Sequence, residues 1–354
     1  MSATSQTARP KWLWIAVALA VVAALVLPFL VKNYRVFQFN LVLVYAIAIL
    51  GLNILTGFNG QISLGHGAFY AIGAYGAAIL MDRFGVPYWA TPPLAGALCF
   101  LFGFLMGFPA LRLSGHYLAV ATLGLALAVP QLLKYKHLEE YTGGVQGIVL
   151  VKPDPPFTFR FLDQPFNADR WLYFFTLAVT VVMFVLAWNL LRGRVGRALI
   201  AIRDHPIAAA TMGINLPMFK SLTFGVSAAF TGVGGALGAI AIAFVSPDSF
   251  LLPLSIFLLV GMVVGGLASI PGAFFGAIFI QYVPNIADEL SKSAPAAIYG
   301  VLLIVLMYLM PTGVMGMLRR LWARWQPGAA RLRVNPKPGA SVPVQPDLTK
   351  ESTT

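Results

Sequence analysis

The sequence is poor in charged residues. Only 10% of its 354 residues are Asp, Glu, Lys or Arg, whereas soluble globular chains carry about 25%. Hydrophobic residues make up 59% of the chain, and the mean hydropathy is +0.81. Most of the chain therefore avoids water, and the composition predicts a polytopic membrane protein rather than a protein with one soluble core.

Cysteine and the residues of catalytic or cofactor sites are also scarce. Because Cys99 is the one cysteine, it cannot form an intramolecular disulfide. It lies within an apolar run and has no neighbouring charge to activate its thiol. The sequence has no metal-ligand spacing, nucleophile elbow or paired catalytic carboxylates. It also lacks a phosphate-binding loop, because no lysine follows a glycine. We therefore expect no catalytic site, cofactor or metal in this chain, and any ATP that drives it would be bound by another chain.

The long apolar runs lack titratable groups. Away from their ends they contain no Asp, Glu, Lys or Arg, which a proton-coupled transporter would need at membrane depth. His66 and His116 lie near the ends of such runs, where a structural hydrogen-bonding role is favoured over a proton relay. The energy for transport is thus expected to come from elsewhere, although a passive channel stays open as an alternative.

Ten apolar runs are long enough to cross a bilayer, which takes about 20 helical residues. The sequence therefore predicts an all-α polytopic fold with about ten transmembrane helices. The eighth and ninth runs are short and separated only by residues 267–270, so they are expected to be tilted or partly re-entrant. The predicted spans cover residues 12–31, 36–56, 63–81, 88–111, 116–133, 171–191, 221–245, 253–266, 271–286 and 296–317.

The basic residues indicate the orientation of these spans. With ten spans both termini lie on one side, and most of the 24 Lys and Arg residues then lie on that side, above all at 192–220 and in the tail at 319–354. Because Lys and Arg accumulate in cytoplasmic segments, both termini are predicted to be cytoplasmic. The net charge of +12 is thus a topology signal with some attraction to anionic lipid, and not a sign of nucleic-acid binding.

A glycine-rich segment, LNILTGFNGQISLGHGAFYAIGAY at 52–75, joins two of the spans. One interpretation is close helix packing around a tight turn, for which glycine is suited by its small size and its access to left-handed backbone. The other adds a translocation path or gate lined by neutral polar side chains. The residues concerned are Gly57, Gly60, Gly65 and Gly67 for packing, and Asn53, Gln61, Ser63 and His66 for the path or gate.

The segment at 192–220 is too polar to span the membrane and too long for a simple turn. Helical composition at 198–202 and 207–211 predicts two short helices. Pro206 suits the start of the second helix, with Asp204 or His205 at its cap, and Gly213 can end it. Taken alone, such a basic loop is a determinant of topology.

Four collinear stretches resemble a known family. The motif N-x-L-T-G-x-x-G-Q-x-S-L-G-H-G-A-F at 53–69 resembles that of the LivM-type permeases of branched-chain amino acid ABC importers. TGGVQGI at 142–148, MVVGGLASIPGAFFGAIFIQYVP at 262–284 and YGVLLIVLMYLMPTG at 299–313 resemble further segments of that family. The resemblance extends over residues 36–316.

The resemblance implies a role for the basic loop, which is similar to the coupling helix that docks on the ATPase of such importers. His205 and Pro206 depart from the acidic residues expected there, which bears on the choice of ATPase. The coupling positions carried over are Gly196, Arg197, Ala201, Ile202, Arg203, Asp204, Ala208, Ala209, Gly213 and Ile214.

The resemblance also implies a function and a set of partners. The chain would be a permease subunit that imports branched-chain or related amino acids across the cytoplasmic membrane of a bacterium. It would pair with a LivH-type sister permease, above two ATPase subunits that hold ATP and Mg²⁺, and a periplasmic or extracellular binding protein would deliver the solute. Two alternatives stay open: a related ABC permease for urea or for aromatic or carboxylic solutes, and a stand-alone solute channel.

The fold of the family is expected to contain two inverted halves, spans two to five and seven to ten, with a path at their interface. The implied segments are an N-terminal tail with the first span at 1–35, the first half at 36–133, an external loop at 134–170, a linking span at 171–191, the coupling loop at 192–220, the second half at 221–318 and a cytoplasmic tail at 319–354.

Overall fold

The computed structural model describes residues 22, 24–110, 115–157, 160–161, 164–290, 292 and 294–325. In chain order the elements are α2 Asn33–Leu52, the π-helix η1 Asn53–Phe58, α3 His66–Asp82, α4 Thr91–Ala110, α5 His116–Leu133, the 3₁₀ turn η2 Lys136–Leu138, α6 Glu139–Thr142, β1 Ile148–Val149, β2 Arg160–Phe161, β3 Gln164–Pro165, α7 Ala168–Arg192, α8 Arg194–Asp204, α9 Pro206–Thr211, α10 Leu216–Ile242, β4 Phe244–Val245, the 3₁₀ turn η3 Pro247–Phe250, α11 Leu252–Gly265, α12 Ile270–Leu290, α13 Pro295–Leu309 and α14 Gly313–Trp325.

The predicted all-α membrane fold is confirmed. Within the described residues eight helical segments are long and apolar enough to cross a membrane, and each corresponds to one of the predicted spans. The predicted third span is α3, which at 17 residues is shorter than these eight. The predicted first span, at 12–31, falls largely outside the described residues, as does the tail beyond residue 325.

The predicted tenth span is wrong at its C-terminal end. The helix α13 stops at Leu309 instead of continuing to residue 317, and a second helix, α14, begins at Gly313. Pro311 lies in the break, where it offers no backbone N–H to continue the helix, and Gly313 has a left-handed φ of +71°. The new helix is amphipathic and carries Arg319 and Arg320, as is typical of helices at a membrane surface.

The predicted ninth span is too short. The helix α12 has 21 residues and continues through Pro284 to Leu290, whereas the prediction ended at residue 286. The preceding helix α11 has 14 residues. A sharp turn with positive φ at Gly266 and Ala268 separates α11 from α12.

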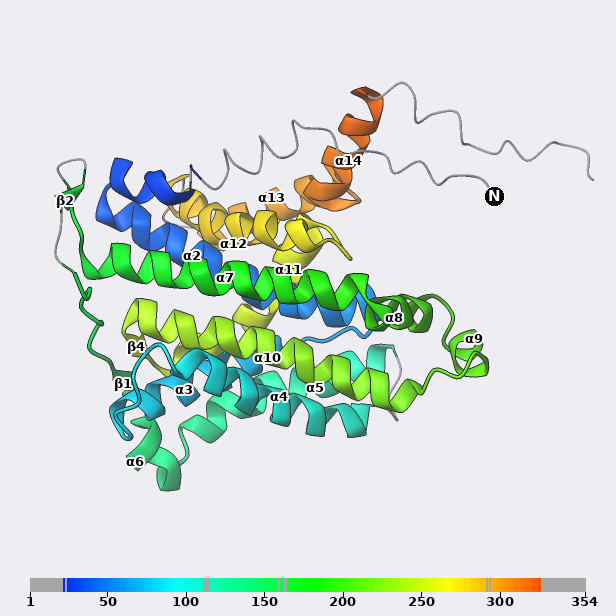
Figure 1. Ribbon diagram of the computed structural model, residues 1–354, viewed down its shortest axis with the longest axis horizontal. Coiled ribbons are helices and arrows are strands. Elements are labelled where there is room, and N and C mark those ends of the chain that lie inside the picture. The colour runs from blue at the N-terminus through cyan, green and yellow to red at the C-terminus, as the bar shows by residue number, and fades with distance from the viewer. Residues whose placement is uncertain are drawn as a thin grey trace, which may run out of the picture. The chain divides into compact units, whose positions relative to one another are not determined.

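The helix α10 is packed against α2, α3 and α4, beside which it runs in Figure 1. Its glycines allow very close approach: a Cβ placed on Gly232 would lie 2.6 Å from Cβ of Cys99 on α4. A Cβ on Gly234 would lie 3.0 Å from the carbonyl oxygen of Val44 on α2, and Gly235 is in similarly close contact with α3. Small residues at such positions let the backbones of membrane helices approach one another.

The two halves exchange their packing partners. The helix α10 of the second half packs on α3 and α4, and α2 of the first half packs on α11 and α12. Close contacts of Gly51 with Ser227 and of Val44 with Gly234 show that α2 and α10 run in opposite directions. This reciprocal, antiparallel packing agrees with the prediction of two inverted halves.

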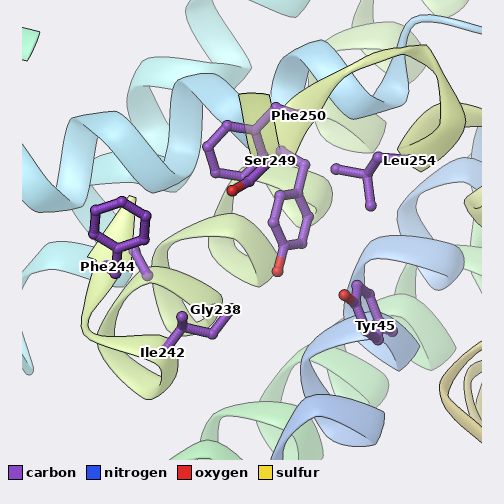
Figure 2. Close-up of a pocket in the computed structure, with 9 residues that line it drawn as sticks. Tyr45, Gly238, Ile242, Phe244, Ser249, Phe250 and Leu254 are labelled. Atoms are coloured by element: carbon purple, nitrogen blue, oxygen red, sulfur yellow. The ribbon is translucent and has the colours of Figure 1, made fainter. Parts of the chain in front are cut away.

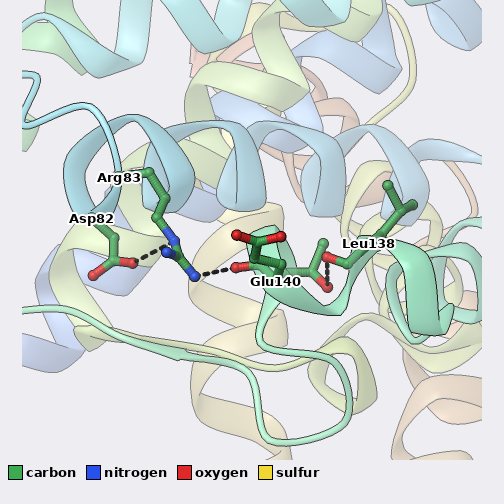
Figure 3. A network of polar contacts seen from close by, with 5 residues as sticks. Asp82, Arg83, Leu138 and Glu140 are labelled. Carbon is green, nitrogen blue, oxygen red and sulfur yellow. Dashed lines mark hydrogen bonds and ion pairs between the residues drawn. The ribbon is translucent and has the colours of Figure 1, made fainter.

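The loop between α5 and α7 folds back on the bundle. Its strand β1 pairs antiparallel with β4, which directly follows α10. In the same loop, Glu140 is bound to the bundle: Arg83 at the end of α3 forms an ion pair with Asp82 and donates a hydrogen bond to the carbonyl of Glu140 (Figure 3). The Thr142 hydroxyl donates to the carbonyl of Leu138, at 3.0 Å. These contacts fasten the loop to the end of the bundle that holds β4.

The close packing of α10 predicts a difference between two glycine substitutions. Gly232→Val should lower the stability of the protein by about 1–3 kcal/mol or more, because the added atoms overlap α4. Gly124→Val on α5 is the matched control, since a Cβ at Gly124 meets no heavy atom within 4 Å. Thermal unfolding of both variants in detergent measures the effect. Equal melting temperatures for the two variants would contradict this account of the packing.

Candidate functional site

The C-terminal end of α2 is fastened to the turn between α11 and α12. There the helix widens into η1, whose first residue, Asn53, is fully buried. The Asn53 Oδ1 accepts a hydrogen bond of 2.9 Å from the backbone N–H of Ala268, and its Nδ2 donates one of 2.9 Å to the carbonyl of Ser269. A Cβ on Gly57 would lie 2.6 Å from the backbone nitrogen of Ala268. Asn53 and Gly57 thus hold the two halves together at this end.

The glycine-rich turn that follows is fastened to the start of α10. Gly60 has a φ of +75°, a left-handed conformation that reverses the chain. The Gln61 Nε2 then donates a hydrogen bond of 3.3 Å to the carbonyl of Lys220, and the Thr56 hydroxyl donates one of 2.9 Å to the carbonyl of Gln61. The Gln61 side chain is buried and orders the turn.

A buried hydrogen-bond chain connects α3, α10 and α2. The Ser63 Oγ lies 3.0 Å from His66 Nδ1, and His66 Nε2 lies 2.6 Å from Ser227 Oγ. The Ser227 hydroxyl donates its proton to the carbonyl of Gly51, at 2.6 Å. Ser227 therefore accepts from Nε2–H, and Nδ1 accepts from Ser63. This arrangement fits a neutral, structural His66, the role that the sequence favoured over a proton relay.

The start of α3 is in close contact with two further helices. A Cβ on Gly65 would lie 2.7 Å from the carbonyl oxygen of Thr122 on α5. The backbone N–H of Gly67 donates a hydrogen bond of 2.9 Å to the Ser255 hydroxyl on α11. These two glycines therefore stand where side chains would separate the helices.

The four polar residues of the predicted path or gate share one environment. Asn53, Gln61, Ser63 and His66 are all buried and hydrogen-bonded, and they join segments from both halves. In this structure they close the bundle at one end instead of lining an open passage. A role in the path or its gate therefore requires these contacts to open, and it stays a prediction.

The basic loop forms the two predicted helices, α8 and α9. Pro206 is the first residue of α9, and His205 precedes it without a side-chain cap. Gly213 ends this helix with a φ of +83°. Its N–H bonds to the carbonyl of Ala210, and the N–H of Ile214 bonds to that of Ala209, which is the Schellman pattern of a glycine-terminated helix.

Arg203 connects this loop to the glycine-rich turn. Its Nη1 donates a hydrogen bond of 2.9 Å to the carbonyl oxygen of Gly57, and its Nε pairs with Asp204 at 2.9 Å. Its Cγ lies 2.8 Å from the place where a Cβ on Gly60 would stand. The absence of a side chain at Gly60 therefore lets α8 lie directly against the turn.

The remaining predicted coupling positions fall into an inner, a half-buried and an exposed set. Leu199, which the sequence reasoning did not single out, is buried with the inner set and anchors α8. The inner positions are Gly196, Ile202 and Ala209, the half-buried ones are Ala201 and Ile214, and the exposed ones are Arg197, Asp204, Ala208 and Gly213.

Sequence reasoning also missed the two most exposed apolar residues of the loop. Ile207 on α9 is 82% exposed and Met212 just after it is 86% exposed. Large apolar side chains in a segment too polar to span the membrane were the signal that could have identified them. An exposed apolar pair beside basic residues is typical of a surface that a partner covers.

The arrangement is suited to transmitting movement. Within the described ranges no group of three or more His, Cys, Asp or Glu residues could hold a metal ion. The contacts instead form a continuous connection from the exposed loop through Arg203 to η1, and from Asn53 to the turn between α11 and α12. A displacement of α8 would therefore reach both halves of the bundle.

Comparison with known proteins places the chain among transport permeases. A family model described as "Branched-chain amino acid transport system / permease component" matches residues 34–311. The chain is 34% identical over 316 residues to the high-affinity branched-chain amino acid transport system permease protein LivM of Escherichia coli K12, covering 84% of this chain and 74% of the relative. LivM of Salmonella typhimurium LT2 matches with the same identity and coverage.

A second group of relatives is more distant. The permease protein LivH of Escherichia coli K12 is 25% identical over 296 residues, which cover 77% of this chain and 91% of the relative. No solved structure matches the chain.

The environment of Asn53 predicts a contrast with Asn59, which is buried although both polar atoms of its amide lack a partner among the described residues. Asn53→Leu should cost about 2 kcal/mol or more, because it leaves the Ala268 N–H and the Ser269 carbonyl without their partner. Asn59→Leu should be neutral or stabilising, because it removes unsatisfied polar groups. Melting temperatures in detergent test this, and a larger loss for Asn59→Leu than for Asn53→Leu would refute it.

Proposed function

The chain belongs to the permease components of branched-chain amino acid transport systems, and from this premise we propose that it forms one half of the membrane pore of an ATP-driven importer. The family match extends from α2 to the end of α13, so it includes both halves and the basic loop. The proposed solutes are branched-chain amino acids, which the names of the LivM and LivH relatives specify. The similarity to both LivM and LivH supports pairing with a sister permease of LivH type.

The contact between Arg203 and Gly57 is the observation that carries the proposal. It joins an exposed loop directly to the closed, buried end of the bundle. A stand-alone channel has no need for such a loop, whereas an importer driven by separate ATPases needs a surface on which they act. We assign that surface to α9 and to the exposed positions of α8 from Arg197 onward, with Ile207 and Met212 as its apolar contacts and Arg197 as a charged one.

The direction of transport follows from the proposed orientation. The loop at 192–220 and both termini would face the cytoplasm, where two ATPase subunits hold ATP and Mg²⁺. The end of the bundle that holds β1 and β4 would face the periplasm or the exterior, where a binding protein delivers the solute. Both assignments rest on the distribution of Lys and Arg and on the family.

In the proposed mechanism the contacts from α8 to η1 transmit the movement of the ATPases to the bundle. Closure of the ATPases would displace α8, and Arg203 would carry this displacement to η1. Because Asn53 fastens η1 to the turn between α11 and α12, and Gln61 fastens the glycine-rich turn to α10, their movement would separate or close the halves at the cytoplasmic end. Ser63 and His66 would then exchange their mutual hydrogen bonds for bonds to the passing solute, as neutral polar groups can do without trapping it.

The experiment reverses the charge pattern of the loop. In the complete complex with its binding protein in proteoliposomes, Arg203→Glu combined with Asp204→Lys should lower L-leucine uptake about tenfold or more. Loss of a hydrogen bond from a charged group costs about 1.5–3 kcal/mol. Arg194→Glu, at another exposed position of α8, is the matched control and should retain most of the uptake.

Two measurements decide the outcome: the amount of the variant in the membrane and the dependence of L-leucine uptake on ATP. The double variant should insert at normal levels, because the change lies outside the spans. If it takes up L-leucine as fast as the wild type, or if the wild type does so without ATP, the chain is a channel and the proposal fails.

A further inference from the structure

A cavity of about 110 Å³ lies at the end of the bundle opposite the coupling loop, where α2, α3, α10 and α11 meet the short elements β4 and η3 (Figure 2). It stands between elements of the two halves, and nothing in the site described above uses it. Its lining residues are Tyr45, Tyr70, Gly238, Ala239, Ile242, Phe244, Ser249, Phe250 and Leu254.

The cavity has an exposed mouth and a buried floor. Ile242, Phe244 and Ser249 at the mouth are exposed, whereas Phe250 and Tyr70 are 7% and 4% exposed. Among the described residues no charged side chain lines it, and most of its surface is aliphatic or aromatic. Such a cavity suits an aliphatic group, whose burial is favourable, and it lacks the fixed charges that would trap a charged solute.

Two tyrosines contribute hydroxyl groups to the wall of the cavity. The rings of Tyr45 and Tyr70 stack with their centroids 6.2 Å apart. Within the described residues neither hydroxyl forms a hydrogen bond, and neither is among the buried side-chain atoms that lack a partner, so both are open to the cavity. A Cβ on Gly238 would collide with the Tyr70 hydroxyl, so the glycine at 238 is what permits this ring position. Both hydroxyls can therefore hydrogen-bond a polar group of a molecule in the cavity.

We propose that this cavity receives a branched-chain amino acid on its way into the membrane, holding its aliphatic side chain between Phe250 and Leu254. The Tyr45 and Tyr70 hydroxyls would hydrogen-bond its ammonium or carboxylate group, replacing part of its lost hydration. Ser249 at the mouth lies where a solute would enter from the β1–β4 end. This inference rests on the proposed function and adds the place where the solute is first held.

The test fills the cavity in the complete complex with its binding protein in proteoliposomes. Leu254→Trp should lower L-leucine uptake strongly, whereas Leu251→Trp should leave it near normal, because Leu251 is exposed and does not line the cavity. Tyr70→Phe keeps the ring and removes only the hydroxyl. It should reduce the uptake rate about fivefold, as expected for the loss of one hydrogen bond.

A protection measurement separates binding from a structural role. In a Cys99→Ala background, Leu254→Cys provides a thiol at the cavity, and L-leucine should slow its reaction with a small maleimide at least about twofold, as for a site half occupied by mass action. Glycine, which has no side chain, should not slow it. The same complex must first show ATP-dependent L-leucine uptake without these substitutions.

The outcomes distinguish this inference from the proposed function. If the wild-type complex takes up L-leucine, but L-leucine gives no protection and Leu254→Trp resembles Leu251→Trp, the cavity is not a solute site and the proposed function stands. If the wild-type complex takes up no L-leucine with ATP, the proposed function fails and the inference fails with it. Protection together with loss of uptake in Leu254→Trp and Tyr70→Phe supports both.

Discussion

The close contact of α10 with its neighbours is the constraint on which the rest of the structure depends. Between helices that already lie in lipid, the hydrophobic effect does not favour association, so their association relies on packing and hydrogen bonds. Gly232, Gly234 and Gly235 bring α10 so near to α4, α2 and α3 that no methyl group fits between them. Such a packed region does not deform gradually, and a displacement at one end moves whole helices. The bundle is therefore rigid enough to transmit a displacement from one end to the other.

Polar contacts determine which segments of the bundle can move relative to one another. At the end beside α8, hydrogen bonds from side chains to backbone groups connect the segments, as for Asn53, Gln61 and Arg203. These bonds can be exchanged for others at low net cost, whereas the packed glycines of α10 cannot be separated so easily. Movement is thus expected at the glycine-rich turn and at the turn between α11 and α12. At the opposite end the cavity beside Tyr70 offers the solute its first site, so the two ends have different tasks.

The sequence predicted the local features of this structure better than its long-range contacts. Apolar runs located the spans, and Pro206 with Gly213 predicted α9, because a helix start and stop depend on neighbouring residues. The break at Pro311 was missed because the apolar run continues on both sides of it. Asn53 was identified as polar and important, but its partner Ala268 is 215 residues away and no local pattern specifies it. Likewise, the position of Arg203 against Gly57 depends on how α7 and α8 pack, which a pattern of basic residues does not reveal.

The central claim is that α8 moves the glycine-rich turn through a firm contact, and a disulfide between the two tests it most directly. A Cβ on Gly60 would lie 3.5 Å from Cβ of Arg203, within the range of about 3.5–4.5 Å that a disulfide spans. In a Cys99→Ala background, Gly60→Cys combined with Arg203→Cys removes the hydrogen bond to Gly57, so the reduced complex should import L-leucine slowly. Oxidation replaces the lost contact with a covalent one, and the account predicts that ATP-driven uptake is then restored, and lost again on reduction. Uptake that is unchanged or falls further on oxidation would show that α8 and the turn must slide past each other, which contradicts the account.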